Sequence, residues 1–215
     1  MAATIIPRNL NQREYLKLLD LNLLPIVLTI GQKSVGKKFL TLSEGFHQLK
    51  NNKFEKLVVT YPHKNAEHEY NDEKRLKTIE YLKQFDSSLL KNIGANRVIV
   101  DKIPTIFGKN LSDSFVVGLN MSDSTTTEMC LFLNNYGKNS KFIATGDTKE
   151  MFSYNGLTDI IYKVKENQHL NYIKNFDFDK SSDEVMMYGV NFELFKLYSE
   201  SFKKLNRFNI KYDEM

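Results

Sequence analysis

Near the N-terminus a buried strand runs directly into a glycine-bounded loop and then into a helix. The strand is PIVLTI at 25–30, a continuous apolar and β-branched run typical of a strand that is covered on both faces. The loop GQKSVG follows at once, and the apolar residues of 37–49 then recur at helical spacing. A strand that leads through a short loop into a helix is the repeating unit of parallel sheets. The chain is therefore restricted to α/β folds.

The same alternation of strands and helices continues along the chain. Further strands are predicted at 56–61, 97–100, 115–119, 141–145 and 170–178, and further helices at 11–23, 73–91, 125–135 and 191–205, with a helix or turn at 156–165. Asn9 or Asn11 is placed to cap the first helix. This order predicts a mainly parallel central sheet with helices on both faces. Its core would contain the buried strand residues Val27, Leu28, Val58, Val59, Val116, Val117, Phe142 and Ile143.

Length and composition fit one globular domain. The chain has 215 residues, of which 41% are hydrophobic, and it has no Pro/Gly/Ser-rich linker, so we predict one domain over 1–215. Its core is expected at about 7–206, with a loosely held tail at 207–215. The single cysteine, Cys130, excludes an intramolecular disulfide and should pack as a small apolar residue. Since there is no long apolar run and no secretory signal, we expect a cytoplasmic protein without a membrane partner.

The charge pattern is compatible with polyanionic partners. The net charge of +4 is far below that of a dedicated DNA-binding arm. Five lysines are expected near the strand ends, either as a phosphate-binding surface or as an ordinary solvated face: Lys33, Lys37, Lys38, Lys102 and Lys109. His63 and His68 stand near Glu67 and Glu69, but their spacing matches no zinc motif. We interpret that segment as a solvated loop and expect no metal site there.

The loop after the first strand carries a phosphate-binding motif. Ligands of parallel α/β sheets bind at the carboxyl ends of the strands, here after residues 30, 61, 119 and 145. GQKSVGKK at 31–38 satisfies GxxxxGK, in which backbone N–H groups surround phosphate oxygens and the lysine reaches the terminal phosphates. The setting between a strand and a helix favours this over a lysine-rich surface turn. The candidate residues are Gly31, Gln32, Lys33, Ser34, Val35, Gly36, Lys37 and Lys38.

The last position of this motif departs from the pattern. Lys38 stands where the P-loop has Ser or Thr, whose hydroxyl binds Mg²⁺. An ammonium group cannot bind a cation and repels one. The sequence therefore predicts ATP or another nucleotide as ligand and argues against Mg²⁺.

Four further segments carry a family resemblance: PRNLNQREYL at 7–16, GKNLSDSFVV at 108–117, TTTEMCLFLNNYG at 125–137 and SKFIATGD at 140–147. In order and spacing the chain resembles the PhoH-like family of P-loop ATPases, relatives of RecA-like helicase cores, over about 7–200. The resemblance implies a three-layer P-loop NTPase fold. It also implies an adenine-reading element at Asn11 and Gln12, and a polar sensor at Thr145 and Asp147.

The same resemblance shows which catalytic positions this chain has replaced. The two acidic residues that follow the family's Walker B strand correspond to Leu119 and Asn120, and Asp123 comes three residues late. An Arg-His pair that completes a neighbour's site corresponds to Tyr188 and Gly189. The hydroxyl, both acids and the arginine serve one reaction, so their joint loss predicts that hydrolysis has been abandoned.

We therefore expect a degenerate PhoH-like pseudo-ATPase that acts by binding nucleotide, nucleic acid or protein. Its lysine-rich composition suggests AT-rich coding, and together with the distribution of the family that it resembles this suggests a phage or viral protein in a host cytoplasm. Two alternatives stay open: a residual nucleic-acid-dependent ATPase, and a protein-interaction module with a closed pocket. The aromatic helix at 191–205 is a candidate contact with another chain, including a second copy in a homo-oligomer.

Overall fold

The fold was analysed in a computed structural model, which describes residues 6–8, 10–20, 24–63, 68–85, 97–147, 154–166, 171–177 and 184–190. The strands are β1 (Ile26–Gly31), β2 (Lys56–Tyr61), β3 (Val98–Lys102), β4 (Ser114–Gly118), β5 (Lys141–Asp147), β6 (Asn171–Asp177) and β7 (Glu184–Val190). The helices are α1 (Leu10–Asp20), α2 (Lys37–Lys50), α3 (His68–Lys83), α5 (Ile103–Ile106), α6 (Thr126–Asn134) and α7 (Gly156–Glu166), with a short 3₁₀ helix η2 (Met121–Asp123). None of these helices is long and apolar enough to cross a membrane.

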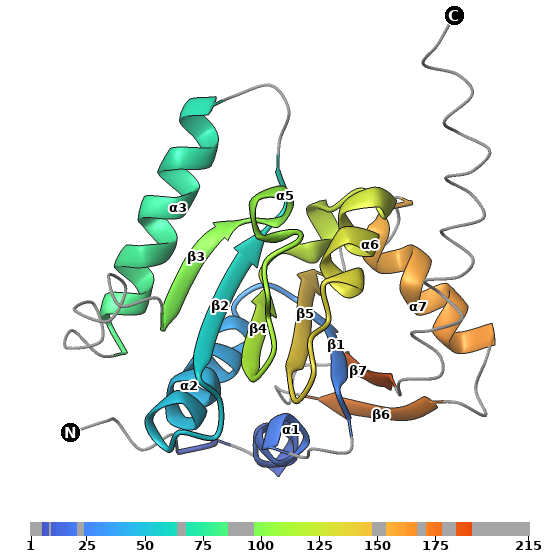
Figure 1. The fold of residues 1–215 in the computed structure, drawn as a ribbon. Coiled ribbons are helices and arrows are strands. Elements are labelled where there is room, and N and C mark those ends of the chain that lie inside the picture. The colour runs from blue at the N-terminus through green and yellow to red at the C-terminus, as the bar shows by residue number, and fades with distance from the viewer. Residues whose placement is uncertain are drawn as a thin grey trace, which may run out of the picture.

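The strands form one sheet in the order β3-β2-β4-β5-β1-β7-β6 (Figure 1). All pairings from β3 to β1 are parallel, whereas β7 is antiparallel to both β1 and β6. The prediction of a mainly parallel α/β sheet is therefore confirmed. Since β5 lies between β1 and β4, the carboxyl ends of three strands from distant parts of the sequence meet at one edge.

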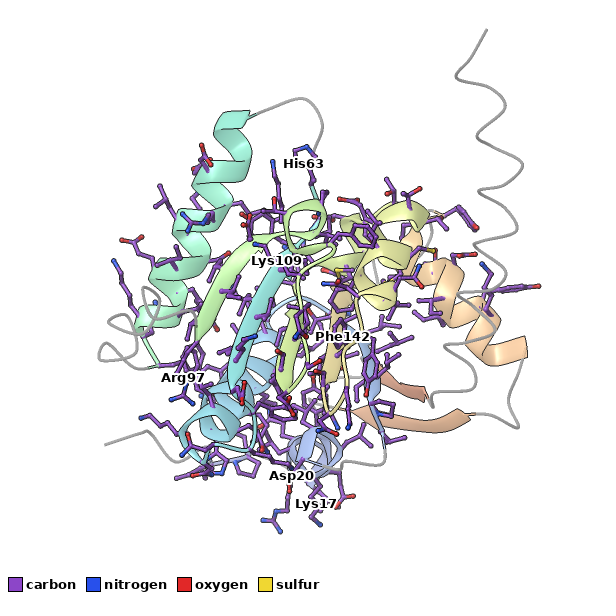
Figure 2. The ribbon with its side chains drawn as sticks, viewed as in Figure 1. Lys17, Asp20, His63, Arg97, Lys109 and Phe142 are labelled. Carbon is purple, nitrogen blue, oxygen red and sulfur yellow. The ribbon has the colours of Figure 1, made fainter. Side chains whose placement is uncertain are left out.

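The predicted core residues are adjacent pairs on four strands, and the two members of each pair lie on opposite faces of the sheet. Val27, Val59, Val117 and Ile143 pack on the face covered by α1, α2 and α3, and Leu28, Val58, Val116 and Phe142 pack on the face covered by α5, α6 and α7. This follows from the period of two along a strand. All eight are fully buried, as predicted, and Figure 2 shows Phe142 in the interior. The three-layer architecture is thereby confirmed.

A chain of buried hydrogen bonds connects β1, α1 and α2. The Thr29 hydroxyl donates to Tyr15 Oη at 3.1 Å, and Tyr15 Oη lies 2.6 Å from Thr41 Oγ1. The Thr41 hydroxyl donates to the carbonyl of Lys37 at 2.7 Å, so its single hydrogen is used and Tyr15 must be the donor to Thr41. Burial raises the pKa of Tyr15 to about 12. The first turn of α2 is thus fixed from beneath through α1.

Some predicted elements need correction. Asn11 lies inside α1 and does not cap it, because the helix begins at Leu10. α3 begins at His68 instead of residue 73. α5, η2 and β7 were not predicted. Asn9, the helix expected at 191–205 and the tail lie outside the described residues.

Candidate functional site

The loop between β1 and α2 has the backbone of a phosphate-binding turn. Ser34 and Gly36 both have positive φ, 67° and 98°, which turns the chain sharply before Lys37 begins the helix. At Gly36 this positive φ costs no strain, because glycine has no side chain. Gly36 is also the N-cap of α2 and makes no side-chain cap hydrogen bond, so no capping side chain occupies the N–H groups of the first turn. A helix start of this kind attracts anions.

A cavity of about 510 Å³ lies in front of this loop. Three strand ends contribute to it: the loop after β1, the turn after β4 and the end of β5, together with one residue of α3. Its lining is Lys33, Ser34, Gly36, Lys37, Lys38, Phe39, Tyr81, Asn120, Ser122, Asp123, Thr145, Gly146 and Asp147. Of the four strand ends expected to bind a ligand, those after residues 30, 119 and 145 contribute to this cavity, and the one after residue 61 does not. An open cavity here disfavours the closed-pocket alternative.

Lys37 is the most buried cation in the cavity wall. Its ammonium donates to the carbonyl of Gly31 at 2.6 Å and to that of Gln32. Burial lowers its pKa to about 8, and the negative charge of Asp147 opposes that shift. The side chain is thus folded back on its own loop, and a phosphate would have to replace the two carbonyls as its partner.

The end of β5 provides polar groups beside the loop. In the parallel register Asp147 lies opposite Gly31, and its carboxylate is 3.9 Å from the ammonium of Lys33. The Thr145 hydroxyl donates to the carbonyl of Gly118 at 3.2 Å, which ties β5 to β4. Both predicted sensor residues therefore lie in the cavity wall, and Thr145 also has a structural bond there.

The first two residues after β4 are Leu119 and Asn120, and neither carries a carboxylate. Leu119 is buried in the core on the α2 side, and its N–H donates to the carbonyl of Thr60 at 2.8 Å. Asn120 has a positive φ of 53° and begins the turn that contains η2. This turn carries Asp123 to the cavity wall. Asp123, which comes three residues after Asn120, thus lines the same cavity as the loop after β1.

A sequence model of the family described as PhoH-like protein matches residues 4–185. The chain belongs to the PhoH-like family. PhoH proteins are a family of P-loop ATPases, which agrees with the fold and with the position of the loop.

Curated relatives carry the same description. The PhoH-like protein of Bacillus subtilis is 27% identical over 171 residues, which cover 74% of this chain and 53% of that protein. The PhoH-like proteins of Mycobacterium tuberculosis and Mycobacterium bovis are 28% identical over 166 residues, which cover 69% of this chain and 45% of theirs. The chain therefore spans about half the length of these relatives.

The residue that departs from the P-loop motif lies against an aromatic ring. The ammonium of Lys38 is 3.8 Å from the ring centroid of Tyr81 in α3. Lys38 also lines a neighbouring cavity of about 240 Å³, whose other charged residues are Glu73, Lys74 and Lys77. Phe39, half exposed, continues this aromatic rim and contacts Phe85 with ring centroids 5.2 Å apart. Tyr81 and Phe39 were not identified from the sequence, because neither lies in a motif.

The other residues implied by the PhoH-like resemblance are placed less directly. The amide of Gln12 lies beside the loop, since a Cβ at Gly36 would be 3.6 Å from its Nε2. Its Oε1 accepts from the N–H of Arg8 at 2.8 Å. Gln12 does not line the cavity, nor do Gly31, Gln32 and Val35. Asn11 has no described side chain, and Tyr188 lies in β7 opposite Leu28, within the sheet.

The wider positive surface is only partly formed. Lys33, Lys37 and Lys38 meet in the cavity, but Lys102 and Lys109 do not line it. The ammonium of Lys109, which is labelled in Figure 2, lies 4.0 Å from the carboxylate of Asp101 instead. The N–H of His63, after β2, donates to the carboxylate of Glu128 at 2.5 Å, and His68 lies in α3. Cys130 is buried among apolar residues, as predicted.

Proposed function

We propose that this PhoH-like protein binds a nucleotide through the loop 31–38 and hydrolyses it very slowly or not at all. This proposal rests mainly on the contrast between the phosphate-binding loop and the turn after β4. The loop, with Lys37 and the start of α2, faces a space of about 510 Å³, and Asn120 lines the same space while Leu119 is buried in the core. These are the two positions after β4 at which the family resemblance implies acids.

The binding half of the proposal rests on groups that suit phosphate oxygens. The uncapped first turn of α2 supplies backbone N–H donors and the positive end of a helix dipole. Lys33, Lys37 and Lys38 add three cations around the same space. A nucleoside triphosphate is the ligand class whose charge matches this set, and ATP is the expected example.

The second half of the proposal, slow or absent hydrolysis, rests on what the cavity lacks at named positions. A water nucleophile needs a base or an orienting carboxylate, and the leaving phosphate needs its charge neutralised. Leu119 faces the core, Asn120 carries no charge, and Lys38 replaces the metal-binding hydroxyl. Two-metal or one-metal phosphoryl chemistry has no ligand set at these positions.

Titration calorimetry with ATP, combined with an assay of phosphate release, tests this proposal. We expect saturable binding without continuing heat, and loss of binding in Lys37→Ala. Lys17→Ala is the matched control, because Lys17 lies on α1 and pairs with Glu14. Steady phosphate release by the wild type would overturn the second half of the proposal, and absence of saturable binding would overturn the first.

A second candidate, residual ATPase activity, is favoured by the position of Asp123. Its carboxylate lies in the cavity wall, where it could act on a water molecule in place of the missing acids. This candidate predicts phosphate release that RNA or DNA stimulates. Release should then disappear in Asp123→Asn as well as in Lys37→Ala, whereas the first candidate predicts no release to lose.

Binding without turnover implies a partner that responds to the bound state. We propose a nucleic acid or another protein chain, a second copy included, in the cytoplasm of a phage host. The basic composition supports a polyanion. Gel filtration with and without ATP, together with an RNA and DNA binding assay, separates these partners.

A further inference from the structure

The cavity does not fit the magnesium ion that P-loop ATPases use. Mg²⁺ prefers hard oxygen ligands in octahedral geometry. The position of the P-loop hydroxyl holds Lys38, and the first position after β4 holds the apolar Leu119. The carboxylates that do line the cavity are those of Asp123 and Asp147, and Asp147 is 3.9 Å from the ammonium of Lys33. Three lysines line the same space, so a dication there meets repulsion.

Lys38 is placed to supply positive charge instead. It is the second residue of α2, directly after Lys37, and its half-buried side chain borders the cavity. The ammonium lies over the ring of Tyr81 at 3.8 Å, a cation–π contact that a stronger anionic partner can replace. Within the described residues no carboxylate forms an ion pair with Lys38.

The surroundings of Lys38 favour an incoming anion. Burial lowers the pKa of Lys38, which means that its charge is poorly solvated where it lies. An anion that enters the cavity would restore the lost solvation and strengthen its own binding. Four-carbon lysine side chains are flexible enough to move from a ring face to a phosphate oxygen.

We propose that Lys38 takes the place of the divalent ion, so that this cavity binds the metal-free form of a nucleoside polyphosphate in preference to its magnesium complex. On binding, the ammonium leaves the ring of Tyr81 and contacts the phosphates. Mg²⁺ weakens binding for two reasons: it cancels part of the ligand's negative charge, and it brings a dication close to three ammonium groups. This inference rests on the proposed nucleotide binding, and it adds the chemical form of the ligand.

The test compares dissociation constants for a non-hydrolysable ATP analogue in EDTA and in millimolar Mg²⁺, at constant ionic strength. For the wild type we expect binding that is at least about tenfold tighter in EDTA. Lys38→Thr restores the P-loop motif and should remove or reverse that preference. Lys38→Met removes the charge without adding a ligand and should lower affinity mainly in EDTA.

Lys33→Met is the matched control, because Lys33 is an exposed cation on the same loop. It should lower affinity in both buffers and keep most of the preference for EDTA, since its exposed charge is screened by solvent and Lys38 stays at the position of the metal-binding hydroxyl. Thermal melting of each variant verifies that it is folded.

The outcomes separate the two proposals. Wild-type binding that is equal or tighter with Mg²⁺ overturns the role of Lys38 and leaves nucleotide binding intact. An unchanged preference for EDTA in both Lys38 variants also overturns it. No binding in either buffer overturns nucleotide binding itself and this inference with it.

Discussion

Two turns at the same edge of the sheet differ in how far they match the pattern of a P-loop ATPase. The loop after β1 has the glycines and Lys37 of a phosphate-binding loop, whereas the turn after β4 has Leu119 and Asn120 at the two positions where the family resemblance implies acids. The difference follows what each position does for the fold. Leu119 packs into the core, where apolar contacts favour it over a carboxylate. The loop after β1 instead lines a cavity, so core packing does not account for the presence of Lys37.

A rival explanation is that the loop survives because the fold needs it. The Thr29, Tyr15 and Thr41 hydroxyls connect β1 to the first turn of α2 and end on the carbonyl of Lys37. The loop could then persist as structure without binding anything. The predictions below distinguish residues that matter to folding from residues that matter to a ligand.

The largest expected effect is on stability, from restoring an acid to the end of β4. Leu119→Asp should lower the free energy of unfolding by about 2–4 kcal/mol, because it removes a buried apolar side chain and buries a carboxyl group. Urea denaturation measures this. Asn120→Asp is the control one residue along, where the side chain is exposed and the change should be within about 0.5 kcal/mol. Equal effects at both positions would mean that Leu119 is not a core residue.

The next effect is on the ligand, from Lys37→Met. This change should weaken ATP binding about 10- to 100-fold, since a hydrogen-bonded charge contributes about 1.5–3 kcal/mol. Its effect on unfolding should be about 1 kcal/mol, because only two carbonyl partners lose a donor. Calorimetric titration and urea denaturation of the same sample measure both. The opposite ranking, with stability lost and affinity kept, would support the rival explanation.

A smaller effect, now on the support beneath the loop, is expected for Tyr15→Phe. Without the phenol oxygen, the Thr29 hydroxyl loses its acceptor and Thr41 loses its donor. The free energy of unfolding should fall by about 1–2 kcal/mol. Affinity for ATP should change less than about threefold, since α2 keeps its other anchors. A larger loss of affinity than of stability would show that the hydrogen-bond chain serves the ligand site directly.

The same contrast explains what the sequence alone can predict. β1, β2, β4 and β5 each contain a short run of apolar or β-branched residues, so their burial in a mainly parallel sheet follows from that pattern and from their alternation with helices. The loop follows from its glycine and lysine spacing. That Asp123 lines the cavity could not be predicted, because its position depends on the positive φ of Asn120, a turn geometry that spacing does not reveal. Tyr81 was missed because its position depends on how α3 docks beside α2, which is a long-range contact.

The smallest predicted effect is a pH dependence of ATP binding that comes from Lys37. In the ligand-free protein the pKa of this lysine is about 8, and phosphate oxygens favour the ammonium form, so the complex has the higher pKa. Binding must therefore take up protons above about pH 8. Affinity should be constant below that pH and fall above it, by no more than about tenfold per pH unit. Calorimetry at pH 9 in two buffers of different ionisation enthalpy measures the proton uptake.

Four other charged groups line the same cavity: Lys33, Lys38, Asp123 and Asp147. Burial lowers the pKa of Lys38 as well, so this second lysine adds an effect of the same sign. Lys37→Met separates the two contributions, because it removes the uptake of Lys37 and leaves that of Lys38. Affinity that rises with pH above 8, or that does not change, would mean that the phosphates do not reach Lys37. The loop after β1 would then have the sequence of a phosphate-binding loop, unlike the turn after β4, without binding a phosphate.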